Sequence, residues 1–134
     1  NWSCVRVADG PPVKMKYLLI LAGGALGALS RVLISDLLEK YQAAIFPLGI
    51  FFVNVIGCFL LGLLINLIGP KHSDIYEPFL FMGFLGAFTT FSAFSREAFQ
   101  LIEQGNYIGV ITYICLTVVG CLLATWLGMN LTKS

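Results

Sequence analysis

The side chains best suited to chemistry cluster in one segment, residues 83–95, which reads GFLGAFTTFSAFS. Its two glycines, two threonines and two serines favour a local break in a helix, because hydroxyl groups compete for backbone partners. Carbonyl groups freed at such a break are good ligands for a hard cation such as sodium. Phe91 and Phe94 are three residues apart, so both rings can lie on one helix face.

Two polar side chains lie within other apolar stretches. Asn54 falls inside residues 41–70, which hold no Asp, Glu, Lys, Arg or His, and its amide needs hydrogen-bond partners in hydrocarbon. It either clamps two helices together or lines a pore as a donor. Arg31 lies about two-thirds of the way along the first expected helix, where a charge costs about 2.5–3.5 kcal/mol. It either snorkels to the membrane interface or makes an electropositive vestibule that attracts anions.

Weakly polar residues recur every four positions near the C-terminus, at Tyr113, Thr117, Cys121 and Thr125. That spacing places them along one face of a helix. The face either packs against another helix or lines a narrow path.

These candidate lining groups are hydrogen-bond donors and aromatic edges. The carboxylates Asp36 and Glu97 are expected toward helix ends, which leaves no obligatory carboxylate in the lining. Phenyl rings have a positive edge, and hydroxyl and amide hydrogens can replace lost hydration water. This chemistry suits a small anion better than a cation or a proton relay.

Four stretches without Asp, Glu, Lys, Arg or His must position these residues: 18–30, 41–70, 78–95 and 104–132. A membrane-spanning helix needs about 20 mostly apolar residues. We therefore predict an all-α integral membrane protein with four transmembrane helices, the third broken at mid-membrane. The helices are expected near Tyr17–Leu38, Ala44–Ile68, Pro78–Leu101 and Tyr107–Met129. Residues 16–134 would form this domain, and residues 1–15 a polar tail that is an extension if Met15 is the native start.

Composition supports a lipid environment. Of 134 residues, 58% are hydrophobic and only 11% charged, whereas soluble domains carry about a quarter charged residues. The net charge of +1, without a basic cluster, gives a nucleic-acid partner no electrostatic basis. The four cysteines lack metal-ligand spacing, and His72 is the only histidine. We expect neither a zinc centre nor enzymatic activity.

Small residues spaced four apart recur in the first and last helices, at positions 23, 24, 27 and 28 and at 120, 124 and 128. They let helix backbones approach closely, and they indicate tight packing by themselves. Four helices make a thin bundle, so a homo-oligomer is expected. The weak positive-inside bias leaves two topologies open, an ordinary one with a cytoplasmic N-terminus and insertion in both orientations. The second would permit an antiparallel dimer.

Residues 83–95 closely resemble the third-helix motif of the Fluc (CrcB) family of fluoride channels. Residues 23–31, GGALGALSR, and 52–57, FVNVIG, look like that family's first- and second-helix signatures. The resemblance covers roughly residues 16–129. It implies a passive channel that exports cytoplasmic fluoride across the bacterial inner membrane. It also implies an antiparallel, dual-topology homodimer with two pores, each lined by both subunits.

The resemblance further implies roles for individual residues. Phe91 and Phe94 would form an aromatic box whose ring edges face fluoride. The other implied pore residues are Asn54, the hydroxyl-bearing Thr90 and Ser92, Tyr113 and Thr117 of the fourth-helix polar track, and Arg31 near a pore entrance. Cys121 departs from the hydroxyl usual in that track. Backbone carbonyls of Gly86 and Thr89, from both subunits, would hold one structural sodium ion at the dimer centre.

Other classes fit the sequence less well. A small four-helix drug/proton antiporter can also insert in both orientations, but it needs a carboxylate deep in its first helix, and residues 18–30 contain none. A non-transporting assembly subunit would explain the small-residue packing but not the third segment with its phenylalanine pair. An intramembrane enzyme would need a nucleophile–base pair that the sequence does not offer.

Overall fold

The computed structural model describes residues 12–40, 46–68 and 73–133, and every regular element within these ranges is a helix. The elements are α1 (Val13–Glu39), α2 (Leu48–Leu67), α3 (Ser73–Tyr76), the π-helical η2 (Glu77–Leu85), α4 (Gly86–Phe88), α5 (Phe91–Glu103) and α6 (Tyr107–Leu131).

Four helical stretches are long and apolar enough to cross a membrane: Val13–Glu39, Leu48–Leu67, Asp74–Glu103 and Tyr107–Leu131. The prediction of an all-helical protein with four membrane-spanning helices is confirmed for the described residues. The predicted start of the second helix, Ala44, lies outside them. The helix as described begins at Leu48 after Pro47, whose missing N–H costs nothing at a helix start.

Large apolar side chains cover the outside of the bundle. Leu33, Ile108 and Leu122 are 60%, 81% and 67% exposed, and they represent many others on all four spans. A contiguous apolar surface of this extent does not persist in water, whereas lipid solvates it without cost. The chain is therefore a multi-pass membrane protein.

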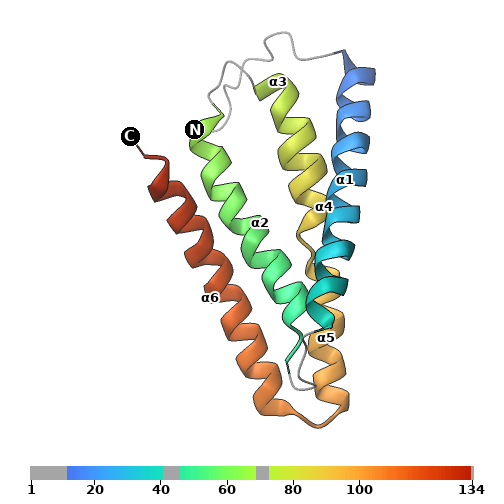
Figure 1. The fold of residues 1–134 in the computed structure, drawn as a ribbon, viewed down its shortest axis with the longest axis vertical. Helices are drawn as coiled ribbons and strands as arrows, with labels where there is room; N and C mark the ends of the chain where they lie inside the picture. The colour runs from blue at the N-terminus through green and yellow to red at the C-terminus, as the bar shows by residue number, and fades with distance from the viewer. Residues whose placement is uncertain (1–11, 41–45, 69–72, 134) are drawn as a thin grey trace.

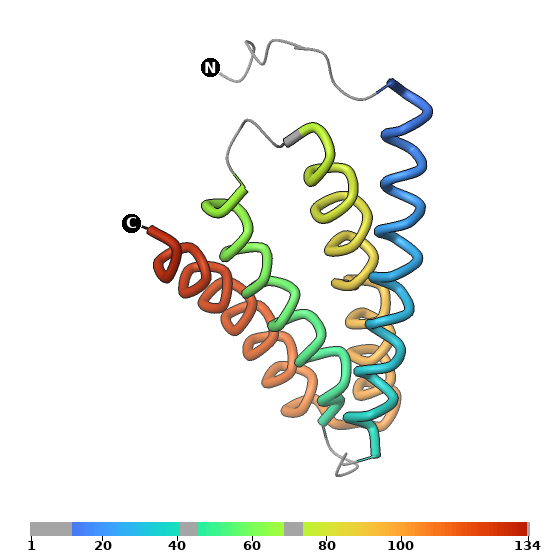
Figure 2. The backbone as a smooth tube through the Cα atoms, turned by 45° about the horizontal axis from the view of Figure 1, so that its top comes forward, coloured from blue at the N-terminus to red at the C-terminus, as the bar shows by residue number. Residues whose placement is uncertain are grey.

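The helices pack in two groups. Figure 1 shows α6 running beside α2, while α1 runs beside η2 and α4, and these are the most extensively packed neighbours. Figure 2 shows the same grouping from a second direction. The groups converge at the end where α5 turns into α6 and splay apart at the other end. The turn uses Gly105, whose φ of 72° favours glycine.

Glycine permits the closest backbone contacts within both groups. A Cβ added to Gly128 of α6 would lie 2.4 Å from the carbonyl oxygen of Phe59 on α2. A Cβ added to Gly27 of α1 would lie 2.2 Å from the carbonyl oxygen of Phe84 on η2. The expected close approach at the small residues of the first and last helices is thus confirmed at these two positions.

Two threonines interrupt helical geometry between α4 and α5. Thr89 has φ −74° and ψ 147°, and Thr90 has φ −148° and ψ 122°, so both are extended. The Thr89 N–H and hydroxyl donate to the Leu85 carbonyl at 3.0 and 2.8 Å. The Thr90 hydroxyl accepts from the Ala93 N–H at 3.3 Å and so caps α5. One threonine side chain therefore helps to end a helix, and the next helps to start one.

The glycine contacts between α2 and α6 predict a position-specific effect. Gly128→Ala should destabilise the fold by about 1–3 kcal/mol, because its Cβ meets backbone that cannot move aside. Gly120→Ala on the same helix is the matched control, since its Cβ meets only side chains at 3.5 Å or beyond. It should be neutral or gain up to about 1 kcal/mol of helix propensity. Unfolding midpoints in detergent measure both, and equal midpoints for the two variants would contradict the packing described.

Candidate functional site

Asn54 of α2 forms hydrogen bonds with Thr90, one of the two extended residues between α4 and α5. We call these two residues, Thr89 and Thr90, the interruption. Its Oδ1 accepts from the Thr90 N–H at 2.8 Å, and its Nδ2 donates to the Thr90 carbonyl at 3.2 Å. Both residues are 8% exposed. An extended residue between two helices lacks the helical hydrogen-bond ladder, so the Asn54 amide supplies partners for both Thr90 backbone groups. The clamp interpretation of Asn54 is confirmed, and its role as a pore donor stays a prediction.

A cavity of about 350 Å³ lies beside this clamp. Its wall consists of Asn54, Cys58, Thr89, Thr90, Phe91, Phe94, Thr117, Val118, Cys121 and Leu122, and we call it the phenyl cavity. It therefore gathers residues of α2, the interruption, α5 and α6. Thr117 is 5% exposed, and its hydroxyl has no hydrogen-bond partner among the described residues. That hydroxyl is a donor left available in a cavity wall that also contains Asn54, Thr89 and Thr90.

A second cavity, of about 480 Å³, also borders the interruption, at Thr90. Its charged lining residues are Arg31, Asp36, Glu39 and Arg96, and we call it the charged cavity. Ser92 lines it, and Thr90 lines both cavities. Its two cations face two carboxylates, so the vestibule is of mixed charge rather than simply electropositive. Arg31 is half-buried there, next to the site rather than within it.

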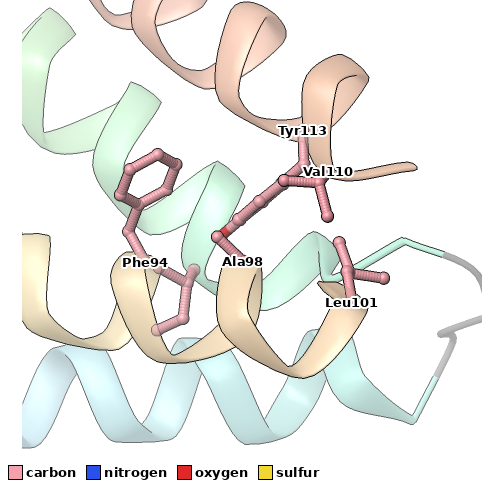
Figure 3. Close-up of a cluster of buried hydrophobic side chains, with 6 residues drawn as sticks. Phe94, Ala98, Leu101, Val110 and Tyr113 are labelled. Atoms are coloured by element: carbon pink, nitrogen blue, oxygen red, sulfur yellow. The ribbon is translucent and has the colours of Figure 1, made fainter. Parts of the chain in front are cut away.

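The two phenylalanines of α5 are neighbours with different environments. Their ring centroids lie 5.5 Å apart with an interplanar angle of 45°. Phe94 is 8% exposed and packs on the Tyr113 ring at 5.2 Å, whereas Phe91 is 79% exposed on the single chain. Figure 3 shows Phe94 and Tyr113 within the buried cluster to which α2, α5 and α6 contribute. Phe94 is anchored in the core, and Phe91 extends to the surface of the chain.

Glu97 is buried, which its charge alone does not predict. It lies toward the end of the third span, Asp74–Glu103, as expected from the sequence, and it is 9% exposed. The Tyr113 hydroxyl donates to its Oε2 at 2.6 Å. Glu97 follows Phe94 by three residues, so the helical period alone places both on one face.

The two residues assigned to sodium lie on different surfaces. Thr89 lines the phenyl cavity, whereas Gly86 lines a shallow groove with Gly24, Gly83 and neighbouring apolar residues of α1 and η2. The described residues contain no cluster of three or more His, Cys, Asp or Glu side chains that could hold a metal.

Fold and site together define a small multi-pass membrane protein with a polar interruption in its third span. The family model for the CrcB-like proteins, described as Camphor Resistance (CrcB), matches residues 18–129, and the chain belongs to that family.

Curated relatives agree with this membership. The protein named "Fluoride-specific ion channel FluC" of Azobacteroides pseudotrichonymphae is 40% identical over 121 residues, which covers 88% of this chain and 96% of that protein. The protein of the same name from Campylobacter jejuni strain 81-176 is 41% identical over 117 residues, covering 87% and 96%. A third, from Legionella pneumophila strain Paris, is 41% identical over 119 residues, covering 87% and 89%.

The clamp makes a prediction about stability. Asn54→Ala should destabilise the fold by about 2–4 kcal/mol, because two buried backbone groups of Thr90 lose their partners. Asn66→Ala is the matched control on the same helix. Asn66 also donates to a backbone carbonyl, that of Met129 at 2.7 Å, but it is exposed, so its removal should cost much less. Unfolding in detergent measures both, and an Asn54→Ala midpoint equal to that of Asn66→Ala would contradict a buried clamp.

Proposed function

We propose that this chain forms a passive, fluoride-selective pore that exports cytoplasmic fluoride. The observation that carries the proposal is the phenyl cavity, where amide, hydroxyl and ring-edge groups converge at the interruption without a carboxylate in the wall. Family membership supports it, because relatives about 40% identical are named for this activity.

Fluoride is small and holds its water tightly, so a pore must replace that water with other donors. Asn54 has a second amide hydrogen beyond the one donated to Thr90. The Thr117 hydroxyl has no partner among the residues that the structure describes, and the positive edges of Phe91 and Phe94 border the same space. These groups together can exchange with hydration water one partner at a time, which lowers the barrier to passage.

Thr90 and Ser92 link the two cavities. Their hydroxyl oxygens lie 3.2 Å apart, so one proton is shared between them and another remains available. Because Thr90 lines both cavities, an anion could pass from Arg31 and the charged cavity to the phenyl cavity along these hydroxyl groups. Arg31 would attract the anion at the entrance and would not hold it.

Tyr113 has a restricted role in this proposal. Its single hydroxyl proton is donated to Glu97, so it can offer an anion only its ring unless that bond breaks. Tyr113 is also fully buried beneath Phe94. Tyr113 and Glu97 would thus hold the Phe94 ring in place without contacting the anion.

We further propose an antiparallel, dual-topology homodimer in the inner membrane of a bacterium. Phe91 is mostly exposed on one chain, so its ring needs a second surface to become part of an enclosed path. The shallow groove that contains Gly24 and Gly86 offers a smooth surface for such contact. The interruption would then lie at mid-membrane depth. Carbonyls of Gly86 and Thr89 from both subunits would meet at the two-fold axis and hold one structural sodium ion.

Ion efflux from liposomes tests the function directly. Purified protein should release fluoride much faster than chloride, without any proton gradient. Imposing an inward or outward sodium gradient should not change the fluoride rate, because the sodium ion is structural. Equal rates for the two halides would contradict selectivity, and a rate that follows the sodium or proton gradient would contradict a passive pore.

The phenylalanine pair should matter for flux more than for folding. Phe91→Ile and Phe94→Ile keep apolar bulk but remove the ring edge, so each should slow fluoride at least tenfold, a barrier increase of about 1.4 kcal/mol. Phe99→Ile, on the same helix and 66% exposed, is the matched control and should conduct normally. Elution as an intact dimer must accompany each efflux measurement. Normal efflux from both single variants would contradict a role of the two rings in conduction and would leave them as packing residues.

Topology can be tested by covalent linkage. Two copies joined through an added transmembrane helix enter the membrane inverted relative to one another, and this fusion should conduct fluoride. The same fusion with a soluble linker of equal length keeps the copies parallel and should be inactive. Activity of the parallel fusion alone would contradict the antiparallel arrangement.

A further inference from the structure

The four charges of the charged cavity come from two helices. α1 supplies Arg31, Asp36 and Glu39, and α5 supplies Arg96. At a helical rise of about 1.5 Å per residue, Asp36 and Glu39 lie about 7.5 and 12 Å further along α1 than Arg31 does. α1 ends at Glu39, at the end of the bundle where the two helix groups converge (Figure 1). The two carboxylates therefore lie nearer that end than Arg31.

The packing of α1 on α2 places these charges at the inside of the bundle. A Cβ added to Gly49 of α2 would lie 2.7 Å from the hydroxyl oxygen of Ser35, which is 8% exposed, so the two helices are in close contact there. Arg31 and Glu39 lie four residues before and after Ser35 and therefore share its side of α1. Ile50 of α2, 6% exposed, forms the adjoining apolar wall of the cavity.

The inner part of the cavity holds the hydroxyl groups of Thr90 and Ser92, whose oxygens lie 3.2 Å apart. Ser92 and Arg96 are four residues apart on α5, so they share a face, with Arg96 about 6 Å nearer the end of that helix. Figure 1 shows α5 running toward the same end of the bundle as α1. An anion that enters from this end therefore meets the two carboxylates and Arg96 before it reaches the hydroxyl groups.

These charged groups act on an entering anion with opposite signs. The two arginines attract it and the two carboxylates repel it, so their formal charges sum to zero. A cleft lined by one sign of charge concentrates ions of the other sign and raises association rates about 10- to 1,000-fold. A balanced lining lacks this effect. Removal of the carboxylates alone would convert the cavity into a positive cleft that accumulates anions.

We propose that Asp36 and Glu39 set the rate at which anions enter the pore, because they offset the attraction of Arg31 and Arg96 at the entrance. The charge-balanced entrance then admits an anion without retaining it. This rate-setting role rests on the proposed function, since it assumes that fluoride enters through the charged cavity. The effect of the two carboxylates on the electrostatic potential of the cavity does not depend on fluoride conduction.

Fluoride efflux from liposomes tests this role by the sign of the change. Asp36→Asn combined with Glu39→Gln removes both charges but keeps the side-chain shapes, so efflux in about 0.1 M salt should rise at least about twofold. Arg96→Gln should lower efflux at least about twofold. The exchange of the two acids, Asp36→Glu with Glu39→Asp, keeps the charge and should keep the rate.

Glu103→Gln is the matched control, because it removes an exposed carboxylate at the end of α5 that does not line the cavity. Its efflux should equal that of the unmodified protein. The differences among the other variants should vanish in about 1 M salt, where the Debye length falls from about 10 Å to about 3 Å. Size-exclusion elution verifies that each variant is folded. An unchanged or slower rate in the folded double amide variant at the lower salt concentration would overturn the role.

A chemical probe measures the potential of the cavity without fluoride transport. Ser92→Cys is introduced after the four native cysteines are changed to serine, and its reaction with a negatively charged methanethiosulfonate is compared with that of a positively charged one. Adding Asp36→Asn and Glu39→Gln should raise the ratio of the two reaction rates at least about twofold in favour of the negative reagent. An unchanged ratio, or no reaction with either reagent, would overturn the inference. Absence of fluoride efflux from the unmodified protein would instead overturn the proposed function, while the ratio still decides the effect of the carboxylates.

Discussion

The hydrogen bonds from the Asn54 side chain to the Thr90 backbone stabilise the point where the third span is not helical. Its amide oxygen and nitrogen bond the N–H and carbonyl of Thr90, two groups that extended backbone leaves without partners in the ladder. In hydrocarbon no water can take over these bonds, so an unpaired backbone would be costly. A single side chain from a neighbouring helix therefore stabilises the interruption within the membrane. The other features of the site depend on this interruption.

The interruption allows one short segment to present several kinds of group. Because α5 restarts after Thr90, Phe94 is directed into the core and packs on Tyr113, while Phe91 faces outward. The same restart places Thr90 in the walls of both cavities. In an uninterrupted helix, the backbone N–H and carbonyl groups bond one another, so only side chains would be available to line a cavity. The tight glycine contacts between α2 and α6 keep the opposite wall fixed while the third span changes direction.

The four spans were predictable because apolar length and missing charges depend on local sequence alone. The cavity walls depend on helix register, which hydropathy does not encode. Glu97 shows the difference: its place toward the end of the third span follows from the pattern of charges, whereas its hydrogen bond to Tyr113 depends on how α5 packs against α6.

Amide hydrogen exchange at Thr90 in the reconstituted protein tests the central claim most directly. If the Asn54 side chain replaces the missing helical partner, the Thr90 N–H should exchange as slowly as that of helical Phe94, although Thr90 is extended. In Asn54→Ala the Thr90 N–H should exchange at least tenfold faster while Phe94 is unchanged. Exchange at Thr90 that is fast in the unmodified protein, or equal with and without the Asn54 amide, would contradict the account.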